Sequence, residues 1–87
     1  MSLVRRTITV KNKQGLHARP AALFVQIANK FDANITVIRD NERVNGKSIM
    51  GILMLGAEKD SAIEIEADGH DAESAIAELE QLVASEE

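Results

Sequence analysis

The chain has 87 residues, a net charge of −4, two histidines and no cysteine. This length fits one domain with a small core, and the lack of cysteine excludes disulfides and thiolate metal sites. No apolar run approaches the length of a membrane span, and the opening MSLVRRTITV is too broken by polar residues to be the apolar part of a signal peptide. We therefore expect a single domain over residues 1–87, located in the cytoplasm and without membrane insertion.

Charge divides the sequence into two parts. Residues 1–57 carry nine Lys or Arg and three acidic residues, a balance of +6, whereas residues 58–87 carry one Lys and eleven acidic residues, a balance of −10. The basic part favours an acidic or phosphorylated protein partner, and the acidic part argues against wrapping a nucleic-acid backbone. Surface charge without any partner is the alternative interpretation.

The first half of the chain predicts a strand, a helix and a hairpin. Residues 7–10 alternate polar and apolar side chains, which is typical of a half-buried strand. From Ala18 to Phe31 apolar side chains recur at helical spacing, and Pro20 fits the first turn because its missing N–H has no intrahelical partner there; the helix should begin at His17. NITVIRD and ERVN follow as two strands joined by a tight turn at residues 40–41.

The second half predicts helix, strand and helix. SIMGILML (48–55) favours a short helix capped by Ser48, and SAIEIEAD (61–68) alternates as a strand with one wet face. After Asp71, a good N-cap residue, apolar side chains mark one stripe of a final helix. The order β-α-β-β-α-β-α predicts a two-layer α+β domain with helices on one face of a sheet.

Three sequence features suggest chemistry that the remaining residues do not support. The letters GKS at 46–48 end a P-loop, but that motif needs a glycine at the position of Asn41, so a turn and a helix cap explain them better. Neither His17 nor His70 has a carboxylate at a spacing that anchors a metal site, so we expect no metal and no cofactor, with His70 in a loop. Both aromatic residues fall on the first helix rather than on the sheet, which argues against nucleic-acid binding.

His17 is the residue with the clearest chemical potential. An N-cap position places its ring beside the unpaired amides of Ala18 and Arg19 and the positive end of the helix dipole, where an attached anion is stabilised. Arg19 can add charge-assisted hydrogen bonds to phosphate oxygens, and the helix end favours a neutral, nucleophilic imidazole. Gly15 would let the loop approach a partner closely. A solvent-facing capping histidine without chemistry is the alternative.

IMGILML holds more apolar residues than one short helix can bury. We predict that Ile49, Leu53 and Ile52 serve the core, and that Met50 and Met54 form an exposed docking patch near His17, with Ile49 also placed at that docking surface. The alternative is that all of these side chains are core.

Three segments carry a family resemblance: GLHARPAALFV (15–25), NGKSIMGILMLGA (45–57) and EIEADGHDAESAIAELEQL (64–82). Together they resemble HPr, the histidine-containing phosphocarrier family of the bacterial phosphoenolpyruvate-dependent phosphotransferase system. The resemblance runs from about Thr7 to Val83. It implies an open-faced β-sandwich, a four-stranded antiparallel sheet covered on one face by three helices.

The resemblance also implies roles for residues. His17 would receive a phosphoryl group from enzyme I on Nδ1 and pass it to a histidine of an enzyme IIA protein or domain, which makes the protein a carrier and not an enzyme. Arg19 would be the phosphate-site arginine, Ala18 and Arg19 would supply backbone donors, and Pro20 would shape the helix start. The first two helices would form the docking surface, and a carrier that meets its partners serially is expected to be a monomer.

Ser48 gains a second role from the same resemblance. In many Gram-positive relatives the matching serine is phosphorylated by a bifunctional HPr kinase/phosphorylase, and the added negative charge would repel acidic partners from the docking face. An alternative function is therefore a regulatory relative, of the nitrogen type or controlled through Ser48, that signals by binding transcriptional or metabolic proteins. A generic α+β small-ligand or metal module is a third alternative, and it predicts that His17 is dispensable.

Overall fold

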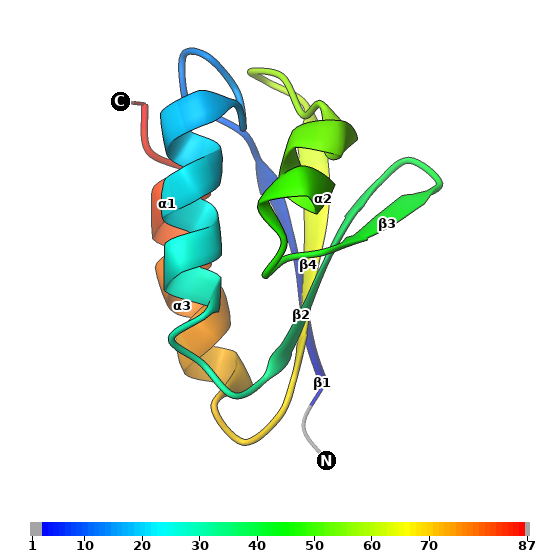
Figure 1. Ribbon diagram of the computed structural model, residues 1–87, viewed down its shortest axis with the longest axis vertical. Coiled ribbons are helices and arrows are strands. Elements are labelled where there is room, and N and C mark those ends of the chain that lie inside the picture. The colour runs from blue at the N-terminus through cyan, green and yellow to red at the C-terminus, as the bar shows by residue number, and fades with distance from the viewer. Residues whose placement is uncertain (1–2, 87) are drawn as a thin grey trace.

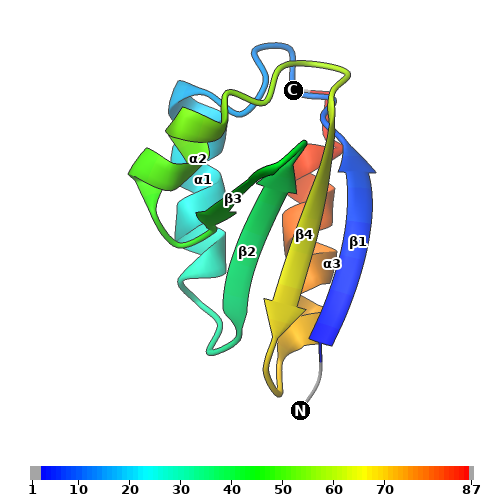
Figure 2. The ribbon, with the colours of Figure 1, turned by 90° about the vertical axis from the view of Figure 1, so that its right-hand side faces the viewer.

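The computed structural model describes residues 3–86. Within this range the elements follow the predicted order: β1 (Leu3–Thr9), α1 (Ala18–Ala28), β2 (Asn34–Arg39), β3 (Glu42–Asn45), α2 (Ile49–Leu55), β4 (Ala62–Asp68) and α3 (Ala72–Val83). The strands form one antiparallel sheet in the order β1-β4-β2-β3. All three helices lie on the same side of this sheet (Figure 2). The predicted α+β open-faced sandwich is confirmed.

The core lies between the sheet and the helices. In β4, Ile63, Ile65 and Ala67 point into it, as the alternation predicts. Helices α1 and α3 pack side by side (Figure 1). Phe24 on α1 and Leu79 on α3 are fully buried. Burial of these apolar stripes supplies the main stabilisation of the fold. In the described part of the chain, no helix is both long enough and apolar enough to span a membrane.

One residue on the open face of the sheet, Glu66, is less exposed to solvent than the sequence predicts. Glu66 is only 9% exposed because two arginines, one on β1 and one on β3, lie over it. Arg5 Nε is 3.1 Å from Glu66 Oε2, and Arg43 Nη2 donates to Glu66 Oε1 at 2.9 Å. This triad connects β1, β4 and β3 across the open face, a contact between distant segments that alternation within one strand does not reveal.

Asp71 occupies the predicted N-cap position of α3 but does not cap that helix. Its two carboxylate oxygens instead accept hydrogen bonds from the backbone N–H groups of Asp32 and Ala33, both at 2.9 Å. The prediction of a side-chain cap is therefore wrong. The physical reason is that the turn between α1 and β2 presents two amides to the same carboxylate, and a charged acceptor binds them both. Asp71 thus ties together two turns at one end of the molecule.

The tight turn between β2 and β3 has the expected length. Asp40 and Asn41 connect strands whose last pair is Arg39 with Glu42, and Asp40 adopts a positive φ of 55°. An aspartate tolerates this conformation better than most residues because its short side chain can bond locally.

Candidate functional site

His17 lies at the N-cap of α1, as predicted. Its backbone is extended (φ −118°, ψ 161°), and its side chain makes no capping hydrogen bond within the described chain. The residue is partly exposed. The start of α1 lies at the end of the molecule where the loop before α1 contacts the loop after α2, at the top of Figure 1. The imidazole of His17 is therefore accessible to solvent and is not used as a helix cap.

The residue after His17 has an unusual backbone. Ala18 adopts a positive φ of 46°, a region that costs an L-residue about 1–2 kcal/mol. The first helical hydrogen bond beside it, from Ala21 N–H to the His17 carbonyl, is long at 3.5 Å. The strained residue therefore directly follows the candidate nucleophile. The sequence did not predict this conformation, because alanine, unlike glycine or asparagine, has no preference for a positive φ.

The loop before His17 is held by the loop after α2. Gly15 is buried with φ +71°, and a Cβ on it would lie 2.5 Å from the Ala57 carbonyl oxygen. Leu16 is fully buried, and its N–H donates to the same oxygen at 2.8 Å. The expectation that Gly15 lets the loop approach a partner stays a prediction, and the structure gives the glycine a role within the chain. The glycine is needed because the chain packs on itself at this point.

A second anchor connects the loop to the end of α3. Asn12 is 2% exposed, and its Nδ2 donates to the Ser85 carbonyl at 3.0 Å and to the Leu82 carbonyl at 3.4 Å. Lys11 N–H donates to the Val83 carbonyl at 2.9 Å. Sequence reasoning missed Asn12, whose only signal was an amide side chain next to a predicted turn. These bonds fix the approach to His17 against a helix that comes some 70 residues later in the chain.

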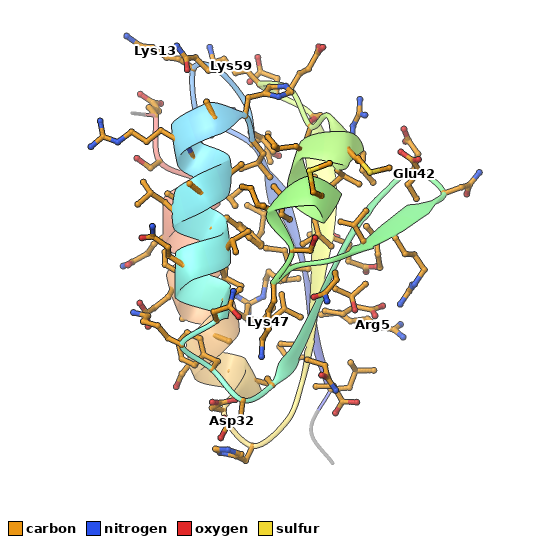
Figure 3. All side chains as sticks on the ribbon, viewed as in Figure 1. Arg5, Lys13, Asp32, Glu42, Lys47 and Lys59 are labelled. Atoms are coloured by element: carbon orange, nitrogen blue, oxygen red, sulfur yellow. The ribbon has the colours of Figure 1, made fainter. Side chains whose placement is uncertain are left out.

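Several cationic side chains lie around this loop, together with Asp60, which pairs with Lys11 at 3.5 Å. Arg19 is exposed in the first turn of α1, where the sequence placed it, and it lines a cavity of about 410 Å³ with Lys13 and Leu23. Lys13 and Lys59 lie close together at this end of the molecule (Figure 3). Pro20 is in the first turn of α1, as predicted. Arginine and lysine side chains at one end attract an anionic group and an acidic partner surface.

Ser48 caps α2 as predicted. Its Oγ accepts a hydrogen bond from Gly51 N–H at 3.1 Å, and the serine backbone is extended (φ −112°, ψ 120°). The side chain is partly exposed. A modification of Ser48 would therefore introduce charge at the start of α2.

The apolar side chains of α2 divide differently from the prediction. Met50 and Met54 are 63% and 72% exposed, as expected, but Ile49 and Leu53 are also 40% and 38% exposed. Assigning Ile49 and Leu53 to the core is wrong, whereas the core position of Ile52 is confirmed. The helix has only two turns, so one narrow face reaches the sheet, and Ile52 and Leu55 fill it. We use the term apolar surface for the exposed side chains of α1 and α2: Leu23, Ile49, Met50, Leu53 and Met54.

His70 lies far from His17, in the turn between β4 and α3. Its Nε2 is 3.0 Å from Asp32 Oδ2, and this contact, followed by the charge of Asp71, raises the pKa of His70 above its ordinary 6.5. Asp32 lies at the opposite end of the molecule from Lys13 (Figure 3). The loop position of His70 is confirmed, but the fold brings Asp32 to it from 38 residues away.

The family comparison decides the class of the protein. A model described as the PTS HPr component phosphorylation site matches residues 4–85, nearly the whole chain. The chain belongs to the HPr family. The family resemblance found in the sequence is therefore confirmed, and HPr proteins are phosphocarriers of the phosphotransferase system.

Individual relatives agree with this assignment. The chain is 45% identical to the phosphocarrier protein HPr of Treponema pallidum, over 92% of this chain and 91% of the relative. It is also similar to an HPr-like protein Crh of Halalkalibacterium halodurans, at 44% identity over 94% of each. A crystal structure of HPr from Bacillus anthracis superimposes with a TM-score of 0.92 at 47% identity, covering 95% of this chain and 99% of that one. A structure described as an HPr dimer from Thermoanaerobacter tengcongensis gives a TM-score of 0.74 at 54% identity over 87% of each chain.

Proposed function

We propose that this HPr protein accepts a phosphoryl group from phospho-enzyme I on Nδ1 of His17 and passes it to a histidine of an enzyme IIA protein. The observation that carries this proposal is an accessible histidine at the N-cap of α1 within a chain that matches the HPr phosphorylation-site family. In each transfer the lone pair of the acceptor nitrogen forms a P–N bond while the P–N bond to the donor breaks. Bonds of the same kind are made and broken, so the exchange is reversible in principle.

The residues around His17 suit a temporary phosphate. In the proposed phosphorylated state, backbone N–H groups of Ala18 and Arg19 and the guanidinium of Arg19 stabilise the phosphoryl oxygens. Arg19 is exposed, so its contact with phosphate is screened by water and stays moderate. A carrier needs this balance, because a phosphate that is bound too tightly would not be transferred onward.

We propose the apolar surface as the docking site for enzyme I and enzyme IIA, with Met50, Met54 and Ile49 as its most important members. It lies on the two helices nearest His17, and methionine thioethers adapt to partner surfaces of different shape. The lysines and Arg19 at the same end would steer acidic partners to it. Substituting Met54 by Gln should raise the KM for enzyme I about fivefold, which corresponds to the loss of one buried apolar contact. Leu3→Gln is the control, since Leu3 is also exposed but lies on β1.

The direct test of the proposed function is phosphorylation by purified enzyme I and phosphoenolpyruvate. The native protein should gain one acid-labile phosphoryl group by intact mass, His17→Ala should gain none, and His70→Ala should behave like the native protein. Transfer onward to a purified enzyme IIA should then regenerate the unmodified mass. Failure of the native protein with enzyme I from several bacteria, or an unchanged reaction of His17→Ala, would refute the carrier role of His17.

A regulatory role through Ser48 is a second candidate. It is favoured by the position of Ser48 at the start of α2 beside the apolar surface, and by the similarity to a Crh protein. Phosphoserine carries a charge of about −1.5 to −2 at neutral pH, which would repel acidic partners from this face. An HPr kinase with ATP should modify the native protein but not Ser48→Ala, and the modified protein should be a poorer substrate of enzyme I. Equal rates with and without the modification would argue against this regulation.

We also propose that the carrier acts as a monomer, so that enzyme I and enzyme IIA can use the same surface in turn. Because solved HPr and Crh relatives include dimers, the oligomeric state is measured by sedimentation at several protein concentrations. A single species of about 9.5 kDa at all concentrations is expected. A stable dimer would contradict this part of the proposal without affecting His17.

A further inference from the structure

Three side chains with metal-binding atoms meet at the end of the molecule opposite Lys13. Asp32, His70 and Asp71 each place one ligand atom such that these atoms all lie within 4.8 Å of one another. His70 Nε2 and Asp32 Oδ2 are 3.0 Å apart. Two ligands of a tetrahedral zinc ion, at about 2.0–2.2 Å from the metal, are separated by roughly 3.3 Å. The observed pair needs to open by only a few tenths of an ångström to bind one ion.

The backbone already holds one of these ligands, the Asp71 carboxylate, in place. Asp71 is fixed by the N–H groups of Asp32 and Ala33, and it directly follows His70. Gly69 packs against Ala33 so closely that a Cβ at Gly69 would lie 2.7 Å from the Ala33 Cα, which sets the distance between the two turns independently of the charged groups. Hydrogen bonds to a ligating carboxylate fix its orientation and support the bound metal. Little ordering of Asp71 is therefore required when an ion binds.

The donor set and its exposure select the kind of ion. One imidazole nitrogen and two carboxylates suit a borderline divalent transition ion such as Zn²⁺, whereas Mg²⁺ and Ca²⁺ prefer sets of oxygen atoms only. With a neutral His70 the three side chains carry a charge of −2, which attracts a divalent cation. The side chains of His70 and Asp32 are 76% and 85% exposed, so an ion can enter from water, and water molecules can complete its coordination.

We infer that Asp32, His70 and Asp71 form a surface site for a zinc-type divalent metal ion. A bound ion would join the turn between α1 and β2 to the turn between β4 and α3. The inference does not rest on the proposed function, because His17 lies at the other end of the fold. The metal would stabilise the folded state by mass action, since the unfolded chain does not bring residues 32 and 70 together.

Calorimetric titration of Zn²⁺ into the full chain tests the inference. We expect one site whose affinity falls at least tenfold in His70→Gln and in Asp32→Asn but is unchanged in His17→Ala. His17 and His70 are the only histidines, so the variants separate the two possible imidazole ligands. An excess of Mg²⁺ should not displace the zinc. Three results would each overturn the proposal. They are undiminished binding in both single variants, His70→Gln and Asp32→Asn; loss of binding in His17→Ala; and no binding to the native chain.

Two further measurements exclude a folding artefact. Both variants change exposed side chains, and amide NMR spectra without metal should show that they keep the native fold. In the native protein, Zn²⁺ should shift the imidazole nitrogen signals of His70 and leave those of His17 in place, and it should raise Tm. A rise in Tm of equal size in native protein and His70→Gln would contradict a site at these residues.

Discussion

Gly15 and Ala57 are in direct contact across two loops: at φ +71° Gly15 leaves no room for a Cβ, which would lie 2.5 Å from the Ala57 carbonyl oxygen. The same oxygen accepts the N–H of Leu16 at 2.8 Å. His17 follows one residue later, so the loop after α2 fixes the backbone that carries the candidate nucleophile. The position of the imidazole thus depends on a contact between segments some 40 residues apart.

Gly15→Ala should lower the free energy of unfolding by about 3 kcal/mol, because it combines an unfavourable φ with a clash against backbone atoms. Gly56→Ala is the matched control: Gly56 also has a positive φ (62°), but its nearest contact for a Cβ is at 4.0 Å. This variant should lose only about 1–2 kcal/mol. Urea unfolding measures both values, and equal losses would show that the contact with Ala57 is not tight.

Ala18→Gly should stabilise the protein slightly or leave it unchanged. Glycine removes the cost of the positive φ at Ala18, about 1–2 kcal/mol, and loses about 0.5–1 kcal/mol through the greater freedom of the unfolded chain. Ala22→Gly, at an exposed position within α1, should instead cost about 1 kcal/mol. Chemical denaturation of both variants measures the free energy of unfolding. A loss of stability in Ala18→Gly as large as in Ala22→Gly would count against strain at Ala18.

Ser48→Ala should cost about 1 kcal/mol, since it leaves the Gly51 N–H without its side-chain acceptor. Ser48→Asp should retain most of the stability because aspartate is also a good N-cap residue. Ser74, exposed in the first turn of α3 but not its N-cap, provides the comparison: Ser74→Ala should be neutral or slightly stabilising. Thermal unfolding of the three variants provides the values. Equal effects of Ser48→Ala and Ser74→Ala would contradict the capping role.

The contact with Asp32 should be visible in the titration of His70. The pKa of His70 is raised first by its hydrogen bond with Asp32 and then by the charge of Asp71, so Asp32→Asn should lower it toward 6.5 without removing the whole shift. NMR titration of the imidazole in metal-free buffer measures this. Since the pKa is higher in the folded state, the stabilisation is present below the unfolded pKa and disappears as pH rises through the folded pKa.

The same linkage predicts how the variant differs from the native protein. The stability advantage of the native chain over Asp32→Asn should be larger at about pH 5 than at about pH 9, because only protonated His70 gains from the aspartate. The effect should be small and weaken with salt, since both side chains are exposed to water. An advantage that grows with rising pH would contradict the assigned direction of the pKa shift.

Local patterns within the sequence determined the element order, the start of α1 at His17, the cap at Ser48 and the exposed methionines of α2. Periodicity, caps and turns depend on neighbouring residues, so they can be recognised without the fold. The motif around His17 also determined the family, because it combines a glycine, a histidine, an arginine and a proline at fixed spacing.

Only the tertiary structure decided which distant groups meet. It placed Gly15 against Ala57, covered Glu66 with arginines from two other strands, and gave the Asp71 carboxylate to amides of the turn at Asp32 instead of to its own helix. It also left Ile49 and Leu53 partly exposed. Chain packing across long sequence separations decides which donors reach one carboxylate, and it decides how much of the sheet a two-turn helix can cover. A local sequence pattern carries no information about either.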